Sequence, residues 1–273
     1  IHGSLNRAGN NINRYITARG IEWTNKHSFI IGLSETVIYS GENRAFDIGY
    51  INPISSHLET ELNERLNIIG DENSNAVWQI HVDYFNSGLR ISGNYLIDEF
   101  VFDPNLEIGK EHGRGYSARL AYTPNFSSEH IFTVFSSLVL IGTPTFRHFY
   151  GANNFVHNGK PLGWFRGSDC QDIFFGANYY KLHNYKLSCS AGFSKSGEES
   201  IQKRVFDSYT DYIRGPFPSG KVIRSVDMNT DFTSLFKSSF SITGICHIEN
   251  LLDEDQLNFR VMIQLQSSIL NFL

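Results

Sequence analysis

Residues 257–266 read Leu-Asn-Phe-Arg-Val-Met-Ile-Gln-Leu-Gln, and almost every second side chain in this stretch is apolar. The apolar set is Leu257, Phe259, Val261, Ile263, Leu265 and, farther on, Ile269; the opposing polar set is Asn258, Arg260, Gln264 and Gln266. Side chains that alternate with period two lie on opposite faces of an extended chain. The stretch therefore predicts a β-strand with one apolar face and one polar face.

The same alternation recurs along nearly the whole chain. We expect eleven strands, over 14–23, 28–40, 76–85, 88–102, 115–123, 129–141, 171–182, 184–194, 221–234, 237–249 and 256–270. Many of them exceed the usual strand of about 5–6 residues and reach the roughly 9–11 residues that cross a bilayer at a tilt. The pattern predicts an all-β fold, a transmembrane antiparallel up-and-down β-barrel with about 11–12 strands in this chain.

Connection lengths between the expected strands support this interpretation. Short connections near 24–27, 86–87, 124–128, 183 and 235–236 alternate with long ones at 41–75, 103–114, 142–170 and 195–220. Barrels of the bacterial outer membrane alternate short periplasmic turns with long extracellular loops. We expect four long loops outside the cell and a C-terminus on the periplasmic side. We also expect residues 1–273 to form a single barrel domain that lacks N-terminal strands, because eleven is odd and single-chain bacterial barrels have an even number of strands.

Composition agrees with a barrel whose strands face lipid on one side and water on the other. Aromatic residues make up 14% of the chain and charged residues only 19%, with a net charge of −5. There is no basic cluster that would predict nucleic-acid binding. No run of about 18 apolar residues predicts a membrane-spanning helix. Of the three cysteines, Cys189 and Cys246 fall on apolar positions of expected strands. A soluble β-sandwich or β-propeller remains an alternative to the barrel.

Two segments depart from simple alternation. Residues 132–141 carry apolar side chains at both parities, which predicts either a strand that faces an interior plug or a strand in an ordinary core. Residues 53–69 place Leu58, Leu62 and Leu66 at helical spacing after Pro53, so we expect a short helix inside a long loop. Such a helix would either fold inward and narrow the lumen or lie outside the barrel.

A search for catalytic or metal-binding patterns favours none. Ser34 and Ser194 each follow a Gly-x pair but lack the second glycine of a nucleophile elbow. The ten histidines include no His-x-x-x-His pair, and the cysteine spacing fits no metal motif. We expect no catalytic residues, no metal site and no cofactor.

Several stretches, taken in order, resemble the Wzi-type capsule assembly proteins of Gram-negative bacteria. They are Glu22-Trp23, residues 31–39 (Ile-Gly-Leu-Ser-Glu-Thr-Val-Ile-Tyr), 46–53 (Phe-Asp-Ile-Gly-Tyr-Ile-Asn-Pro), 96–100 (Leu-Ile-Asp-Glu-Phe), 157–163 (His-Asn-Gly-Lys-Pro-Leu-Gly) and 167–169 (Gly-Ser-Asp). The resemblance implies a barrel in the cell outer membrane, larger than eleven strands and with a polar, partly occluded interior. It also implies a non-enzymatic role in which the protein holds capsular or other surface polysaccharide at the cell surface. We expect a barrel to contact outer-membrane lipid, and the sequence leaves contacts with other envelope proteins open.

The sequence leaves three functions open: a polysaccharide anchor, a porin-like or substrate-specific channel, and a structural subunit of a larger envelope complex. For the anchor, the candidate sugar contacts are Tyr39, Asp47, Tyr50, Asn52, His57 and Glu59 around the first long loop, and Arg147, Tyr150, Asn154, His157, Trp164, Arg166 and Asp169 in the third. For each of them, packing within the loops is the alternative. Arg14, Arg19, Glu35 and Asp98 are candidates for a polar network in the lumen.

Overall fold

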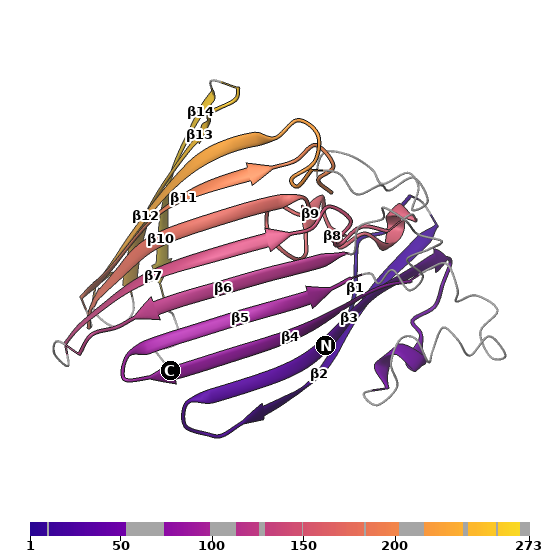
Figure 1. Ribbon diagram of the computed structural model, residues 1–273, viewed down its shortest axis with the longest axis horizontal. Helices are drawn as coiled ribbons and strands as arrows, with labels where there is room; N and C mark the ends of the chain where they lie inside the picture. Colours follow the sequence, from indigo (N-terminus) through magenta and orange to yellow (C-terminus); the bar gives the residue numbers. More distant parts are fainter. Residues whose placement is uncertain are drawn as a thin grey trace.

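The computed structural model describes residues 1–9, 11–52, 74–98, 113–125, 129–148, 150–182, 184–201, 216–236, 240–254 and 256–267. Within these ranges the chain is built almost entirely of β-strands (Figure 1). The strands are β1 (His2–Ser4), β2 (Ile12–Thr24), β3 (Phe29–Glu42), β4 (Ser74–Asn86), β5 (Leu89–Ile97), β6 (Arg114–Tyr122), β7 (His130–Ile141), β8 (Val156–His157), β9 (Lys160–Pro161), β10 (Cys170–Lys181), β11 (Tyr185–Ser196), β12 (Ile223–Phe236), β13 (Phe240–Leu251) and β14 (Gln256–Ser267). Two short 3-10 helices, η1 (Ile48–Ile51) and η2 (Gly151–Asn153), lie in the connections.

Twelve of these strands form one sheet in the order β1-β2-β3-β4-β5-β6-β7-β10-β11-β12-β13-β14, and each neighbouring pair is antiparallel. Within this sheet, each strand pairs with the sheet strands that come before and after it along the chain, and the hairpin of β8 and β9 lies apart, between β7 and β10. This is the up-and-down topology predicted from the alternation. In the described part of the chain, β1 and β14 each have one neighbour, so both edges of the sheet are unpaired.

All eleven expected strands are confirmed, most of them to within two or three residues at each end. The sequence missed β1, which has three residues and includes Gly3, and the separate hairpin of β8 and β9, whose strands have two residues each. The helix expected over 53–69 lies outside the described residues.

The two faces of the sheet differ in chemistry. One face carries apolar side chains that are open to the surroundings, such as Leu257, Phe259 and Ile263, which are 69%, 65% and 72% exposed. Register places further exposed apolar side chains on this same face in the other strands: Ile21, Trp23, Leu33, Ile80, Leu120, Ile173 and Met228. An exposed apolar band on long antiparallel strands fits the hydrocarbon of a bilayer, so this is the lipid-facing side of a transmembrane wall. No helix among the described residues is both long enough and apolar enough to cross a bilayer.

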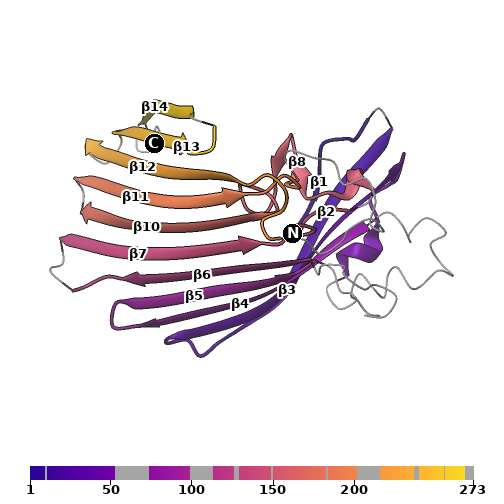
Figure 2. The same cartoon turned by 45° about the horizontal axis from the view of Figure 1, so that its top comes forward.

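The opposite face encloses the connection between β7 and β10, residues 142–169, which we call the lumen loop. Its contacts reach β2, where Arg14 donates to the Val156 carbonyl, and β13, where Arg166 pairs with Glu249. These strands stand nine steps apart in the sheet order, or about 43 Å on a flat sheet at about 4.8 Å a step. Ten residues extend over at most about 35 Å, and the β8–β9 hairpin turns part of them back. The sheet curves around the loop, as Figures 1 and 2 show, and so brings both strands within reach of it.

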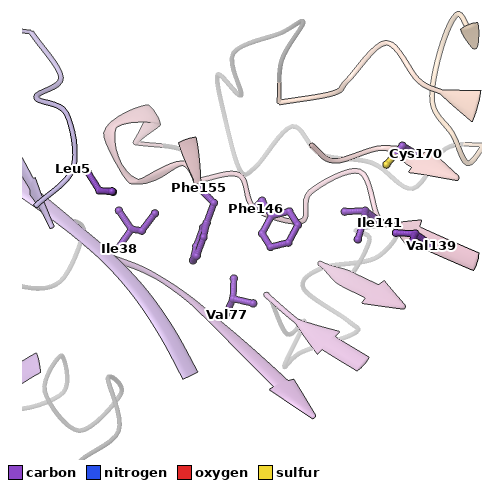
Figure 3. Close-up of a cluster of buried hydrophobic side chains, with 8 residues drawn as sticks. All are labelled: Leu5, Ile38, Val77, Val139, Ile141, Phe146, Phe155 and Cys170. Carbon is purple, nitrogen blue, oxygen red and sulfur yellow. The ribbon is translucent and has the colours of Figure 1, made fainter. Parts of the chain in front are cut away.

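A small apolar core fastens the lumen loop to the inner face. Phe146 and Phe155 of the loop pack against Val77, Val139 and Ile141, which are at most 6% exposed (Figure 3). This explains why residues 132–141 are apolar at both parities: the strand faces lipid on one side and an interior plug on the other. Of the two interpretations that the sequence left open, the plug is correct.

Candidate functional site

Arg14 fixes the first half of the lumen loop to the inner face of β2. Its guanidinium donates to the carbonyls of Ala152, Asn154 and Val156, the last two at 2.9 Å. Arg14 is only 5% exposed. An arginine presents five N–H donors in a rigid fork, so one side chain can satisfy several carbonyls of an irregular segment. The inner face of β2 thus carries a socket for the loop backbone.

Adjacent strands extend this attachment through polar side chains. The Ser40 hydroxyl donates to Asn153 Oδ1 at 2.7 Å, and the Asn75 amide donates to the carbonyls of Arg147 and Asn153 at 3.4 and 3.3 Å. The backbone N–H of Phe146 donates to the Asp98 carboxylate. Since backbone groups buried without partners are costly, these bonds allow a non-regular segment to lie inside the barrel.

Arg166 fixes the second half of the loop from the other side of the lumen. Its Nε, Nη2 and Nη1 lie 3.0, 2.7 and 3.4 Å from carboxylate oxygens of Asp172, Asp227 and Glu249, on β10, β12 and β13. The Trp164 indole N–H also donates to Asp172. Asp172 and Asp227 are 0% and 3% exposed, so one arginine compensates a buried acidic wall.

Asp169 joins the lumen loop to the connection between β11 and β12. Its carboxylate accepts hydrogen bonds from Thr143 Oγ1 (3.0 Å), the Ser219 N–H (2.9 Å) and hydroxyl (2.6 Å), and the Glu199 N–H (3.2 Å). The side chain is 0% exposed. A Cβ on Gly197 would lie 1.9 Å from Asp169 Oδ2, so the close approach requires glycine there. All the acceptor capacity of Asp169 serves this junction.

Further candidates of the third long loop are also used internally. Arg147, whose side chain is 0% exposed, pairs with Glu199 at 3.4 Å, and the Asn154 side chain accepts from the His148 N–H. The ring of His157 accepts from the Asn6 N–H at 3.2 Å. Burial lowers the pKa of His148 to about 4, so this imidazole is neutral at physiological pH.

The candidates of the first long loop gather on the lipid-facing side of β2, β3 and β4. Tyr39 and Tyr50 stack at 4.3 Å and are 0% and 1% exposed, and the Arg44 guanidinium lies 4.9 Å from the Tyr39 ring centre. The Asp47 carboxylate accepts from the Gly49 N–H and so caps η1. The Asn52 carbonyl accepts from Arg19 at 2.7 Å. His57 and Glu59 lie outside the described residues.

The four candidates for a lumen network divide between the two faces. Arg14 and Asp98 lie on the inner face and bind the lumen loop, whereas Arg19 and Glu35 form an ion pair on the lipid-facing side. The Trp78 indole donates to Glu35 at 2.6 Å. The expectation of one network in the lumen is corrected here, because Arg14 and Arg19 are five positions apart on one strand and so point to opposite faces.

For these candidates the sequence allowed sugar contact or loop packing, and the observed contacts are those of packing, with one exception. Tyr150 is half-buried at the start of η2, and in the described part of the chain its hydroxyl has no recorded partner. The residues that the sequence missed are Asp172, Asp227 and Glu249. Each lies on the polar parity of its strand near a strand end, and this position was a signal available in the sequence.

Within the described residues, neither candidate serine lies in an arrangement typical of a catalytic site. Ser194 lies 2.5 Å from the Ser225 hydroxyl and 3.2 Å from Asp227, but it is 1% exposed beneath the lumen loop. Ser34 lies within β3 rather than at a turn into a helix. Among the described residues, no group of three His, Cys, Asp or Glu side chains could hold a metal ion. The three cysteines are free thiols.

The comparisons with known proteins identify the fold. No protein-family model matches the chain, and no curated protein matches it. Among solved structures the chain is similar to Wzi, an outer membrane protein involved in group 1 capsule assembly in Escherichia coli and named as a carbohydrate-binding β-barrel. The TM-score is 0.59 at 9% identity, over 96% of this chain and 52% of that one, so this chain spans about half the length of Wzi. An outer membrane channel from Pseudomonas putida matches 94% of this chain and 82% of its own at 9% identity, with a TM-score of 0.34 that is too low to indicate a shared fold. The barrel fold implied by the sequence resemblance is thus confirmed.

Proposed function

We propose that this chain forms the wall of an outer-membrane barrel of a Gram-negative bacterium and holds capsular or related surface polysaccharide at the cell surface without catalysing a reaction. The observation that carries the proposal is the lumen loop, which is fastened by Arg14 on one side and by Arg166 on the other. A loop tied down on both sides of the lumen occupies the interior of the wall and presents a fixed polar surface at its end.

Orientation supports this role. The lumen loop and the described parts of the connections that follow β3 and β11 lie at one end of the sheet (Figure 1). In outer-membrane barrels the long loops face the outside and the short turns face the periplasm. The surface formed by the long connections therefore faces the polysaccharide layer.

The likeness to Wzi supports the ligand class. Wzi is described as a carbohydrate-binding protein involved in capsule assembly, and the two chains share a fold. A porin would need an aqueous path past the lumen loop. In this chain Arg166 ties the loop to carboxylates of β10, β12 and β13 on the lumen side of the sheet, which argues against such a path. We therefore favour an anchor over a channel.

The test is deletion of the gene in its own host. We expect polysaccharide synthesis to continue, with the polymer released from the cells into the medium rather than retained. Complementation with the native gene should restore retention, and a variant with Arg147→Ala, Trp164→Ala and Arg166→Ala, which loses the loop fastening, should not. Unchanged retention in the deletion strain would refute the anchor, and steady conductance of the purified native protein in planar bilayers would favour the channel.

The unpaired edges support a second, structural proposal. In the described part of the chain, β1 and β14 present free backbone groups at the edges of a sheet that is otherwise a continuous ladder. In a bilayer, unpaired strand edges are costly because no water is present to satisfy them. We propose that further strands, from the same polypeptide or from another, pair with these edges. Copurification after mild detergent extraction would identify a second polypeptide.

A further inference from the structure

The contacts above do not involve a group of polar side chains that line a pocket beside the lumen loop. A pocket of about 330 Å³ opens at the long-loop end of the sheet, between the turn that precedes β2, the end of β3 and the start of η2. Its lining consists of Ala8, Gly9, Asn11, Ile12, Glu42 and Tyr150. Ligand pockets range from about 300 to 1,000 Å³, so this one suits a single small unit of a larger ligand.

The frame of the pocket is held by the backbone. Ile12 and Glu42 face each other in the register of β2 and β3, the Ala8 N–H donates to the Ile12 carbonyl, and the Asn43 N–H donates to the Asn11 carbonyl at 2.8 Å. The Tyr150 N–H donates to the His148 ring at 3.1 Å. Three separate parts of the chain therefore hold the pocket in place before any ligand binds.

Its side chains remain available. Within the described parts of the chain, the Glu42 carboxylate, the Asn11 amide and the Tyr150 hydroxyl have no recorded hydrogen bond or ion pair, unlike the other polar candidates around the lumen loop. A carboxylate and an amide offer adjacent acceptors and a donor to neighbouring hydroxyl groups. The Tyr150 ring adds a flat apolar surface with a polar end.

We propose that this pocket is a subsite for one neutral pyranose unit of a polysaccharide, with the sugar against the Tyr150 ring and its hydroxyls on Glu42 and Asn11; this rests on the proposed function. The lining contains one anionic group and no cationic one. A uronate placed there would set two carboxylates side by side, which is unfavourable. The neighbouring His148, neutral at physiological pH, does not compensate the charge. The site therefore discriminates against acidic sugars.

The experiment measures binding of the full-length protein in detergent to an array of neutral and uronate-containing oligosaccharides. Native protein should bind neutral glycans, and Tyr150→Ala should weaken this binding about tenfold, a loss of about 1.4 kcal/mol. Glu42→Gln should raise binding of uronate-containing glycans relative to neutral ones, a gain that misfolding could not produce. The matched controls are Tyr122→Ala, an exposed tyrosine at the end of β6, and Glu254→Gln, in the turn between β13 and β14.

The experiment distinguishes refutation of the subsite from refutation of the proposed polysaccharide role. Native protein that binds no glycan would refute the polysaccharide role and the subsite with it. Native protein that binds neutral glycans equally well in all the variants would refute the subsite alone. Native protein that prefers uronate-containing glycans would overturn the assignment to neutral sugars.

Discussion

Replacement of Arg166 tests whether the lumen loop is held by charge. Arg166→Met keeps much of the side-chain volume but leaves Asp172, Asp227 and Glu249 without their cation. Removal of one partner from a buried ion pair costs about 3–5 kcal/mol, because the remaining charge stays desolvated. Two of these carboxylates are nearly inaccessible to solvent, so the upper part of this range applies. At 1.36 kcal/mol per factor of ten, a cost of about 4–5 kcal/mol should make the detached state of the loop roughly 900- to 5,000-fold more populated.

Hydrogen–deuterium exchange of the loop amides measures this population directly. The N–H groups of Gly142 and Phe146 donate to the Arg114 carbonyl and the Asp98 carboxylate, which lie outside the lumen loop, so they exchange when it detaches. Arg166→Met should accelerate their exchange by the factor above, and addition of Asp227→Asn should reverse part of the effect by removal of an uncompensated charge. Arg224→Met, which breaks an exposed pair with Asp253, is the control and should leave the loop unchanged. Exchange in Arg166→Met within twofold of native would refute the reasoning.

Three further predictions concern other contacts. Asp169→Ala removes the acceptor of four hydrogen bonds and should lower the free energy of unfolding by about 4 kcal/mol in a urea titration in detergent; an unchanged midpoint would contradict the junction. The folded pKa of His148, about 4, lies below its unfolded value of about 6.5, so the unfolded state binds the proton first. Stability should therefore fall as pH drops from about 6.5 to about 4, by about 3 kcal/mol in all, and His148→Gln should remove that part of the slope; equal slopes in both proteins would argue against it. A nitroxide on Cys189, with Cys170 and Cys246 replaced by serine, should collide more with oxygen than with a nickel chelate, since Cys189 is exposed on the lipid-facing side; the reverse preference would place that face in water.

Much of the fold follows from the sequence because a barrel strand is a local pattern. Alternation fixes which residues form a strand, and the lengths of the connections fix its direction, so both were predictable without tertiary information. β1 was not, because three residues that include glycine give too short a pattern to detect. The face on which a side chain lies could be predicted from the alternation but not from the polarity of the side chain. Arg19 and Glu35 are charged, yet alternation places them with Ile21 and Leu33 on the lipid-facing side.

The candidate site was less predictable, because its contacts join distant parts of the chain. Ser40 and Asn153 are 113 positions apart, and Arg166 and Glu249 are 83 apart. Nothing local in the loop sequence separates an arginine that binds a sugar from an arginine that binds an acidic wall. What the sequence does offer is the partner: acidic residues on the inward parity near strand ends, such as Asp172 and Asp227, predict that a cation will be drawn into the lumen.

Residues that hold the lumen loop in place differ from residues that can contact a ligand. A polar loop inside a barrel must satisfy its own buried groups first, since each unpaired one costs about 1–3 kcal/mol. Residues that meet this need, such as Arg14, Arg166 and Asp169, are unavailable to a ligand for as long as the loop stays in place. Recognition then falls to polar groups that the fold positions but does not use, and Glu42 and Tyr150 fulfil this condition within the described residues. If the loop and the pocket are built in this way, Arg166→Met should weaken glycan binding only indirectly, by displacement of Tyr150, whereas Tyr150→Ala should weaken it with the loop still in place. Exchange and binding measured on the same two variants therefore distinguish a residue that positions the site from one that contacts the sugar.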